Sequence, residues 1–396
     1  MKIYLLRGDS KSMLNWIKQT KADPYSFEIL NNKCSLPLFF IKSVRAETAN
    51  IIKQTALSVG CDCSVGRGVI SGEKDLSDMM VMCTKSQLKK IKEKLKGQPF
   101  SLEKIADAMV ETLDLKDKFF VRGADLLEKD RFVIMGILNL TKDSFYDGGS
   151  YRTVDDALKK TEQMLNEGAK IIDVGGESSR PGSEPVEERV EIERVMPFLK
   201  KAIKRFEGII FSLDTYKSNI AEAALKEGVS IINDISGLRF DKRMSEVIAK
   251  ERAACILMHM KGSPKSMQDS PYYENPPFEV TDYLEESVDI AEKAGIDPYS
   301  ISVDPGIGFG KTKEHNLDLL KNIDILRSLG KPVCVGVSNK RFIGSILDAD
   351  EKQRVLGTVG ANTTALLNGA RIFRVHNVRE NYQALKVAEE ILYAGD

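Results

Sequence analysis

The sequence predicts an α/β protein made of a (β/α)8 TIM barrel preceded by a small α/β domain. Three observations predict this fold. Eight short apolar runs recur between residues 133 and 375, with amphipathic helical patterns between them. A polar, hydrogen-bonding side chain follows each run. Residues 1–115 lack this rhythm and hold two lysine-rich helical stretches instead, so a separate domain is expected there.

The first domain, residues 1–115, is expected to be a small α/β sandwich, and its role is left open. Two helical patterns and two apolar runs support it, at residues 47–57, 85–95, 38–41 and 79–83. Residues 113–131 mix charged residues with a short apolar run, which predicts a connector or a short hairpin.

The second domain, residues 118–396, contains the eight apolar runs that we expect to form strands. They are residues 133–138, 171–174, 209–213, 230–232, 255–258, 301–303, 333–335 and 372–375. Helical patterns supply crossovers at residues 154–166, 221–227 and 287–294, which implies a parallel sheet buried on both faces. Eight such units in about 270 residues match a (β/α)8 barrel. A doubly wound sheet is the alternative, but no glycine fingerprint follows the first strand.

Composition excludes several classes of protein. Lys+Arg and Asp+Glu both total 58, so the net charge of zero argues against a general nucleic-acid binder. No apolar run approaches the roughly 18 residues that a membrane span needs. The start of the chain, MKIYLLRGDSK, has too short an apolar core for a secretory signal. Six unevenly spaced cysteines do not form a disulfide framework, so we expect a cytoplasmic protein.

Polar residues follow all eight predicted strands. In strand order they are Asn139; Glu177, Ser179 and Arg180; Asp214; Asn233 and Asp234; His259; Asp304; Ser338 and Lys340; Arg374 and His376. Helix N-caps would explain one or two of these positions. Because the carboxyl ends of barrel strands share one face, all eight together predict an active site there.

The motifs around these residues resemble one family. In order along the chain they are MGILNLTKDSFYDGG (135–149), DVGGESSRPG (173–182), SLDT (212–215), NDISG (233–237), MHMKGSPKSMQ (258–268), DPGIGFGK (304–311), SNKRFIG (338–344) and RIFRVHNV (371–378). Each motif alone is weak, but eight in this order on a barrel resemble dihydropteroate synthase of folate biosynthesis. The resemblance covers about residues 118–396 and leaves the first domain out.

The resemblance implies a transferase, which joins 6-hydroxymethyl-7,8-dihydropterin diphosphate to 4-aminobenzoate and releases pyrophosphate. The family is described as breaking the C–O bond first, so no covalent nucleophile is required. The resemblance also implies bound Mg²⁺ and a homodimer. Small molecules are then the expected substrates, with neither nucleic acid nor membrane as a partner.

Two sets of residues match the family's binding positions, and a third set is expected at the aminobenzoate. Those expected to bind the pterin are Asp214, Asn233, Asp304, Lys340 and Arg374. Those expected at the diphosphate are Asn139, Ser179, Arg374 and His376, with Asn139 also a ligand of Mg²⁺. Those expected at the aminobenzoate are Phe145, Ser179, Arg180, Pro181, Phe309 and Arg341. Catalysis is expected to rest on Asp214, Lys340, Arg374 and His376.

The chemistry of the substrate is consistent with these assignments. Pterin N–H groups need carboxylate acceptors, and a wrong ligand leaves a buried carboxylate unpaired. Charge that develops on pyrophosphate needs cations placed in advance. Each residue also has a structural alternative to a role in binding. Taken alone, an aspartate in an Asp-Pro-Gly turn such as Asp304 more often only builds the turn. Arg374 could instead form a salt bridge at the end of its strand.

Three positions depart from the family pattern. Lys142 replaces a usual proline, Asn339 replaces an arginine, and Arg341 replaces a serine that receives the aminobenzoate carboxylate. An arginine still suits a carboxylate as a bidentate partner. These departures equally allow a different arylamine, or an altered response to sulfonamide analogues.

Other motifs and functions are less favoured. GIGFGKT at 306–312 ends like a nucleotide-binding loop, but Pro305 stands where its first glycine belongs. Cys61 and Cys63 form one Cys-x-Cys pair without a second, and the three histidines lack zinc spacing. A pterin-dependent methyltransferase and a non-catalytic barrel that binds a pterin or a partner stay as alternatives.

Overall fold

The computed structural model describes residues 3, 10–141, 153–178 and 182–394. The chain forms two compact units, one of residues 1–115 with 394–396 and one of residues 116–393. The division into domains at 1–115 and 118–396 stays a prediction of the sequence.

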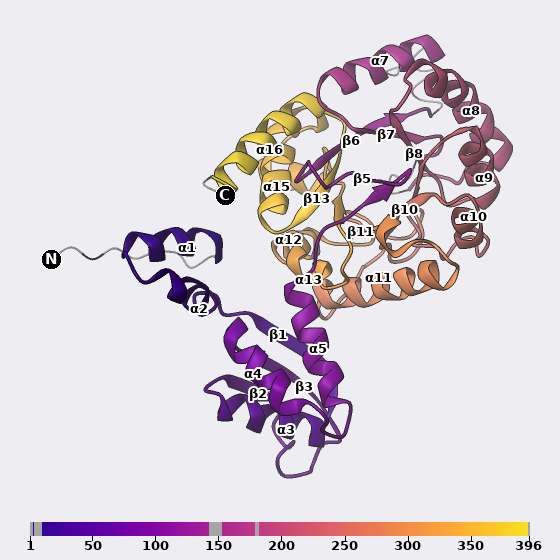
Figure 1. The fold of residues 1–396 in the computed structure, drawn as a ribbon. Helices are drawn as coiled ribbons and strands as arrows, with labels where there is room; N and C mark the ends of the chain where they lie inside the picture. The colour runs from indigo at the N-terminus through magenta and orange to yellow at the C-terminus, as the bar shows by residue number, and fades with distance from the viewer. Residues whose placement is uncertain (1–2, 4–9, 142–152, 179–181, 395–396) are drawn as a thin grey trace. The chain divides into compact units, whose positions relative to one another are not determined.

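The second unit is a closed barrel of eight parallel strands ringed by helices (Figure 1), which confirms the predicted fold class. The strands are β6 Val133–Asn139, β7 Ile171–Gly175, β8 Ile210–Asp214, β9 Ile231–Asp234, β10 Ala254–Met258, β11 Ile301–Asp304, β12 Val333–Val335 and β13 Ala370–Val375. The helices are α7 Val154–Asn166, α8 Glu188–Arg205, α9 Ser218–Glu227, α10 Met244–Lys250, α11 Pro276–Lys293, α12 Lys313–Lys321, α13 Ile323–Arg327, α14 Arg341–Leu347, α15 Val355–Leu367 and α16 Val378–Leu392. Strand β13 pairs with β6 and closes the barrel.

Both faces of the strands are buried, as the apolar runs predicted. On β13, Phe373 packs with the core between strands and helices, whereas Ile372 belongs to a cluster inside the barrel. Alternate residues of a strand point to opposite faces, so Arg374 shares the interior face with Ile372. The interior is therefore apolar where the strands begin and becomes polar where they end.

A short hairpin closes the barrel at the beginning of its strands. Strands β4 Phe120–Val121 and β5 Ala124–Asp125 pair antiparallel, which confirms the hairpin expected within 113–131. Phe119 is fully buried and packs in one cluster with the interior residues Val133, Ile171 and Ile372. Asp117, just before the hairpin, accepts hydrogen bonds from two barrel arginines, Arg327 and Arg371.

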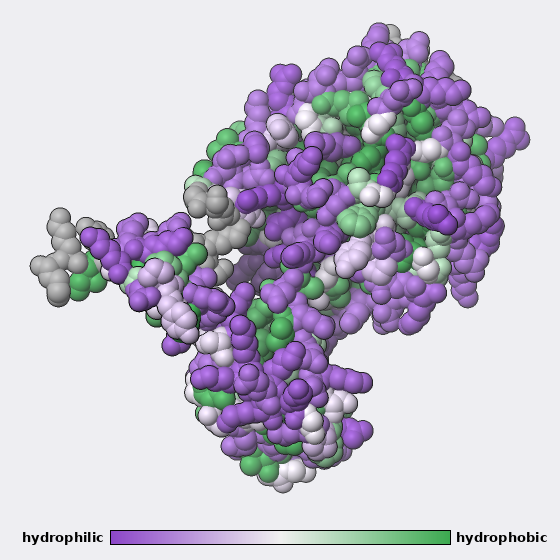
Figure 2. Space-filling view, in the orientation of Figure 1, coloured by the Kyte–Doolittle hydropathy of each residue, from purple (hydrophilic) through white to green (hydrophobic). Residues whose placement is uncertain are grey.

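The helix predicted at 154–166 has those bounds in α7, whereas the other two predicted barrel helices begin earlier than expected. Residues 221–227 are only the end of α9, and residues 287–294 overlap only the end of α11. Helix α11 begins at Pro276, because the side chain of Asn275 caps it by accepting from the Phe278 N–H. In the space-filling view, hydrophilic residues cover the outer ring and hydrophobic ones gather toward the middle of the barrel (Figure 2).

The first unit has a three-stranded antiparallel sheet in the order β1-β3-β2. Its strands are β1 Leu38–Arg45, β2 Asp62–Val65 and β3 Leu76–Met82, and its helices are α1 Ser10–Gln19, α2 Phe27–Asn31, α3 Ala46–Ser58, α4 Lys85–Leu95 and α5 Leu102–Leu113. The expected helices at 47–57 and 85–95 and strands at 38–41 and 79–83 are present. The sequence analysis missed the other elements of this unit. Helices α3, α4 and α5 share a buried core with the sheet.

None of the helices in the described part of the chain combines the length and the apolar character that crossing a bilayer requires.

Phe119→Ala should lower the free energy of unfolding of the barrel by about 3–5 kcal/mol, because it opens a cavity in the closed end. Urea unfolding followed by far-ultraviolet circular dichroism measures this. The fluorescence of Trp16, the only tryptophan, would report on the first unit instead. Phe240→Ala, at a side chain that is 46% exposed, is the control. Equal losses in the two variants would contradict the role of the hairpin as a closure.

Candidate active site

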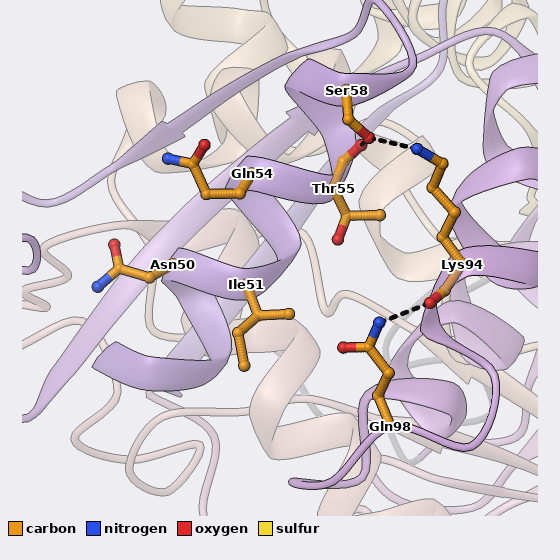
Figure 3. A pocket seen from close by; sticks show the side chains of 7 residues that line it. All are labelled: Asn50, Ile51, Gln54, Thr55, Ser58, Lys94 and Gln98. Atoms are coloured by element: carbon orange, nitrogen blue, oxygen red, sulfur yellow. Dashed lines mark hydrogen bonds between the residues drawn. The ribbon is translucent and has the colours of Figure 1, made fainter.

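Features of a functional site occur in two places in the chain, a pocket on the first unit and the strand ends of the barrel. A pocket of about 540 Å³ on the first unit is lined by Asn50, Ile51, Gln54, Thr55, Ser58, Lys94 and Gln98 (Figure 3). Its one cation, Lys94, already donates to the Ser58 hydroxyl, and its lining residues include no acid. Buried acids and cations instead gather where the barrel strands end, which is where barrel enzymes place their chemistry.

The guanidinium of Arg374 lies between two carboxylates from neighbouring strands. Its Nε donates to Asp173 Oδ2 and its Nη2 to Asp214 Oδ2, both at 2.6 Å. Asn233 Nδ2 donates to the same oxygen of Asp173 at 3.2 Å. The side chain of Asp173 is fully buried, and those of Asp214 and Arg374 are nearly so. One cation thus holds two acids at the centre of the mouth.

This arrangement leaves acceptors available to a ligand. Two carboxylates share one guanidinium, so the cluster keeps an excess of negative charge. Burial raises the pKa of Asp214 to about 7, against the opposing effect of Arg374. Among the described residues, Asp173 Oδ1 is buried and has no hydrogen-bond partner. An N–H group of a bound ligand would satisfy it.

Asp304 and Lys340 form the opposite side of the mouth. Burial raises the pKa of Asp304, although Lys340 opposes the shift. Burial likewise lowers the pKa of Lys340 to about 8, with Asp304 opposing and Arg374 adding to the shift. Lys340 Nζ donates to the carbonyl of Ile307. A side chain at Gly336 would enter the space between Arg374 and Asp304, so this glycine keeps the centre of the mouth open.

Asn139 and His376 complete the ring of strand ends. Asn139 pairs with Gly175, which pairs with Asp214. A Cβ on Gly175 would lie 3.4 Å from Asn139 Oδ1, so this glycine lets Asn139 approach the acids. His376 Nδ1 lies 3.0 Å from the Ser338 hydroxyl.

The barrel therefore places most predicted site residues at one end. Those brought to this end are Asn139, Asp214, Asn233, Asp304, Lys340, Arg374 and His376. Four others lie outside the described residues: Phe145, Ser179, Arg180 and Pro181. Lys142 lies outside them too.

The remaining aminobenzoate residues differ in their surroundings. Phe309 is half-buried against Met258 and its neighbours, and Lys340 Nζ lies 4.5 Å from the centre of its ring. Arg341 is exposed and begins α14. Asn339 has φ 54°, a left-handed conformation that asparagine tolerates better than most residues. This left-handed backbone conformation explains why an asparagine suits position 339.

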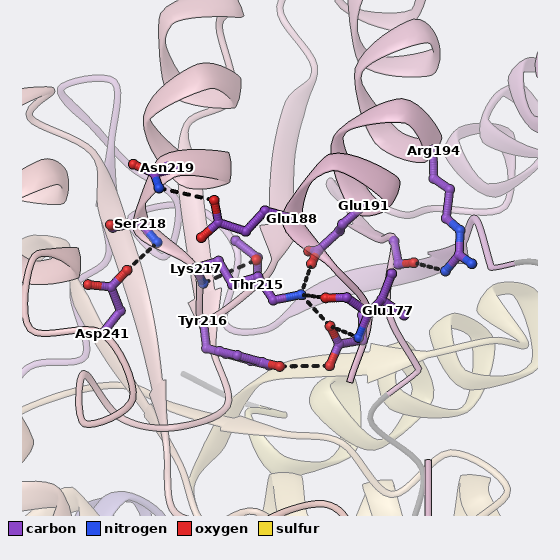
Figure 4. A network of polar contacts seen from close by, with 12 residues as sticks. Glu177, Glu188, Glu191, Arg194, Thr215, Tyr216, Lys217, Ser218, Asn219 and Asp241 are labelled. Atoms are coloured by element: carbon purple, nitrogen blue, oxygen red, sulfur yellow. Dashed lines mark hydrogen bonds and ion pairs between the residues drawn. The ribbon is translucent and has the colours of Figure 1, made fainter. Parts of the chain in front are cut away.

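A second buried network lies beside the mouth (Figure 4). Lys217 Nζ donates to Glu177 Oε2 at 2.5 Å and to Glu191 Oε2 at 2.7 Å. It also donates to the carbonyl of Val186 at 2.5 Å, and Tyr216 donates to Glu177 at 2.8 Å. Burial alone would lower the pKa of Lys217, but the two carboxylates raise it. The network ties the end of β8 to both Glu177 and Val186, and so to the connection between β7 and α8.

Sequence reasoning missed Asp173, Glu191 and Lys217 as members of these networks. Two of them had a signal in the sequence. Asp173 is an acid inside the apolar strand IIDVG, and Lys217 follows Asp214 by three residues. Cys255 and Cys334 are buried in strands. His259 is buried at the mouth, and its ring contacts Lys311. Within the described ranges, no three His, Cys, Asp or Glu side chains gather as metal ligands would.

The fold and the strand-end cluster define a (β/α)8-barrel enzyme that holds a small ligand with buried carboxylates, an amide and cations. Residues 135–376 match the family model described as pterin binding enzyme. A dihydropteroate synthase of Clostridium beijerinckii is 44% identical over 264 residues, which are 66% of this chain and 95% of that protein. The chain therefore belongs to the pterin-binding enzymes and, within them, to the dihydropteroate synthases.

Two further proteins extend the comparison. A solved structure of Xanthomonas albilineans dihydropteroate synthase with 4-aminobenzoic acid has a TM-score of 0.63 and is 38% identical, covering 68% of this chain and 96% of that one. A probable bifunctional folylpolyglutamate synthase/dihydropteroate synthase of Halobacterium salinarum is 38% identical over 346 residues. That match covers 87% of this chain and 42% of that protein. The barrel unit takes in only residues 116–393, which is shorter than the 346 residues matched. The match therefore reaches into the first unit.

Lys217→Met should lower the free energy of unfolding by about 3–5 kcal/mol, because it leaves two buried carboxylates without their cation. Lys217→Met combined with Glu191→Gln should lose less, since one of those charges is then absent. Urea unfolding followed by circular dichroism compares them, and Lys226→Met, in an exposed pair with Glu222, is the control. If Lys217→Met unfolds like the control, the network does not stabilise the barrel.

Proposed function

We propose that this chain is a dihydropteroate synthase that joins 6-hydroxymethyl-7,8-dihydropterin diphosphate to 4-aminobenzoate and releases pyrophosphate. The observation that carries this reaction is the buried guanidinium of Arg374 between Asp173 and Asp214, opposite Asp304 and Lys340. A flat ring with N–H donors and ring acceptors needs such acids and cations on two sides. Its anionic leaving group needs positive charge nearby.

The pterin is proposed to lie between the two sides of the mouth. Asp214 and Asp304 would accept from its N–H groups, and Asn233 and Lys340 would donate to its ring acceptors. Arg374 keeps Asp214 in place and adds positive charge near the ring. An analogue without the matching N–H groups would leave a carboxylate buried and unpaired, which gives the site its selectivity.

The diphosphate is proposed to lie beside Asn139, Ser179, Arg374 and His376. The amide oxygen of Asn139, close to Gly175 and Asp214, suits Mg²⁺, which takes few protein ligands and completes its shell with phosphate oxygens and water. When bound, Mg²⁺ would neutralise charge on the leaving pyrophosphate. Arg374 and His376 would supply donors from the protein itself. Asn139→Ala should raise the Mg²⁺ concentration that gives half-maximal turnover.

The arylamine is proposed to attack the methylene carbon after the C–O bond has broken. Asp214 would then stabilise the cationic pterin, and the enzyme needs no covalent nucleophile. Phe145, Ser179, Arg180, Pro181, Phe309 and Arg341 are proposed to hold the aminobenzoate. The ring of Phe309 beside Lys340 supports this, whereas Arg341 would have to turn from solvent toward the mouth. A higher KM for 4-aminobenzoate in Arg341→Ser would test that movement.

A homodimer and a cytoplasmic location complete the proposal. Large apolar side chains are exposed on three consecutive barrel helices: Ile346 and Leu347 on α14, Leu356 and Leu367 on α15, and Val387 and Ile391 on α16. Burial of such side chains drives association. Sedimentation velocity would show whether Leu356→Glu reduces the mass of the particle. Cell fractionation tests the location, which we infer from the six unevenly spaced cysteines.

Arg374→Ala should lower kcat for arylamine-dependent pyrophosphate release by about 10²–10³-fold, because a donor to the developing charge is lost. The assay combines purified protein, the dihydropterin diphosphate and Mg²⁺, with and without 4-aminobenzoate, and follows both pyrophosphate and dihydropteroate. Arg379→Ala, on the exposed surface of α16, is the matched control. Wild-type protein that releases no pyrophosphate would overturn the proposed reaction, and an unaffected Arg374→Ala would overturn the proposed diphosphate site.

The pH profile of kcat/KM for the pterin substrate should be bell-shaped, with an acidic limb and a basic limb. Asp214 must be ionised to accept N–H groups, so kcat/KM should fall as pH drops through its pKa of about 7. Lys340 must be protonated to donate, so kcat/KM should fall as pH rises through its pKa of about 8. Steady-state kinetics in constant-ionic-strength buffers measures both limbs. An acidic limb that persists in Asp214→Asn would assign that limb to another group.

A further inference from the structure

The loop between β11 and α12 is held by side chains rather than by a ladder of backbone hydrogen bonds. Five consecutive carbonyls, from Gly306 to Gly310, each accept from a side chain. The donors are Lys311 to Gly306 and Phe309, Lys340 to Ile307, Gln268 to Gly308 and Tyr273 to Gly310. A buried carbonyl without a partner is costly, so this loop depends on its donors.

The loop also packs closely on the segment that follows β10. Gly306 has φ 64°, and a Cβ there would lie 1.9 Å from the carbonyl oxygen of His259. Gly310 has φ 63°, and a Cβ there would lie 2.5 Å from the carbonyl oxygen of Lys261. Only glycine allows this approach. The loop therefore packs its backbone directly on residues 259–261.

Lys311 lies under this loop and is 3% exposed. Its Nζ contacts His259 Nδ1 at 2.8 Å and the carbonyl oxygens of Gly306 and Phe309 at 3.0 Å each. In the part of the chain that the structure describes, no ion pair of Lys311 with a carboxylate is found. Burial, and then the charge of Lys340, lower its pKa well below the usual value.

A neutral amine fits these three contacts. A charged Nζ would donate to both carbonyls and to an unprotonated Nδ1. An uncharged Nζ, with two N–H groups and one lone pair, would donate to both carbonyls and accept from Nδ1–H of a neutral His259. Burial, and next the charge of Lys311, also lower the pKa of His259 well below its usual value. All three contacts are then satisfied without a buried cation. The backbone N–H of His259 also donates to the Asp304 carbonyl at 2.9 Å.

We propose that Lys311 and His259 are a positioning pair, which fixes the loop at residues 304–311 so that Asp304 and Lys340 are correctly placed for the pterin. This inference rests on the proposed function, because that proposal assigns the pterin to Asp304 and Lys340. Neither residue touches the substrate. Lys311 holds the two carbonyls on either side of Ile307, whose own carbonyl accepts from Lys340. The His259 side chain holds Lys311, and the His259 backbone N–H donates to the carbonyl of Asp304.

An uncharged amine is suited to this task. A charged Lys311 would add a third cation beside Lys340 and Arg374 and would lower the pKa of Lys340 further. It would also oppose the cationic pterin of the proposed reaction. A neutral Lys311 gives the loop its donors without that charge.

The test replaces Lys311 with methionine, which keeps most of the volume and cannot donate. Lys311→Met should raise KM for the dihydropterin diphosphate about tenfold, the scale of one lost hydrogen bond. It should change KM for 4-aminobenzoate less than about twofold, and amide hydrogen exchange in peptides covering 304–311 should become faster. Lys313→Met, at an exposed position two residues on, is the control.

His259 supplies a second variant pair if Lys311→Met folds poorly. His259→Asn keeps a polar group where Nδ1 lies and should preserve both KM values, whereas His259→Phe should reproduce the split of Lys311→Met. Unchanged exchange at 304–311 in Lys311→Met or His259→Phe would overturn the pair, as would an equal rise of both KM values. Hydrogen exchange needs no substrate. An inactive wild type would therefore overturn the proposed function, while faster loop exchange in the variants would still establish the positioning contacts.

Discussion

The active site depends on one buried guanidinium that serves two carboxylates. Taking charges out of water costs several kcal/mol for each ion, and only close, well-directed hydrogen bonds offset it. Arg374 meets this condition with two contacts of 2.6 Å, to Asp173 and Asp214. Burial is the main cause of the raised pKa of Asp214, and because two carboxylates share this guanidinium, the negative charge of Asp173 adds to the shift. The unpaired oxygen of Asp173 has the same origin, because one guanidinium and one amide cannot satisfy four carboxylate lone-pair directions.

The barrel separates stability from chemistry along each strand. Ile372 and Arg374 lie two residues apart on the interior face of β13, yet the first packs against the closing hairpin and the second holds the acids. The same order recurs on β7 with Ile171 and Asp173. An apolar layer at the closed end therefore supports a polar layer at the open end. Gly175 and Gly336 leave space between the strand ends where a ligand can enter.

The sequence predicted the eight strands and the residues that follow them, because an apolar run and the polar residue at its end are local features. It did not predict the role of Asp173, because an acid inside an apolar strand gains its partner from β13, two hundred residues away. Lys217 and Lys311 were missed because lysine is usually solvated, and only the fold brings carboxylates or carbonyls to them. In the first unit, α5 and β2 were missed. Strand β2 pairs with β3 in the sheet, but no motif in the sequence links the two segments.

Three lysines near the mouth differ in the direction or size of their pKa shift because they differ in their number of carboxylate neighbours. Lys217 has two in direct contact, and these raise its pKa despite burial. Burial lowers the pKa of Lys340 to about 8, with Asp304 opposing the shift and Arg374 adding to it. Lys311 has no carboxylate in contact, and its pKa falls well below the usual value. Burial acts on all three in the same direction, so the carboxylates decide the outcome. Of the three, Lys340 has a pKa of about 8 and faces the proposed pterin position. The other two hold the surrounding loops, Lys217 through two carboxylates and Lys311 through carbonyls and His259.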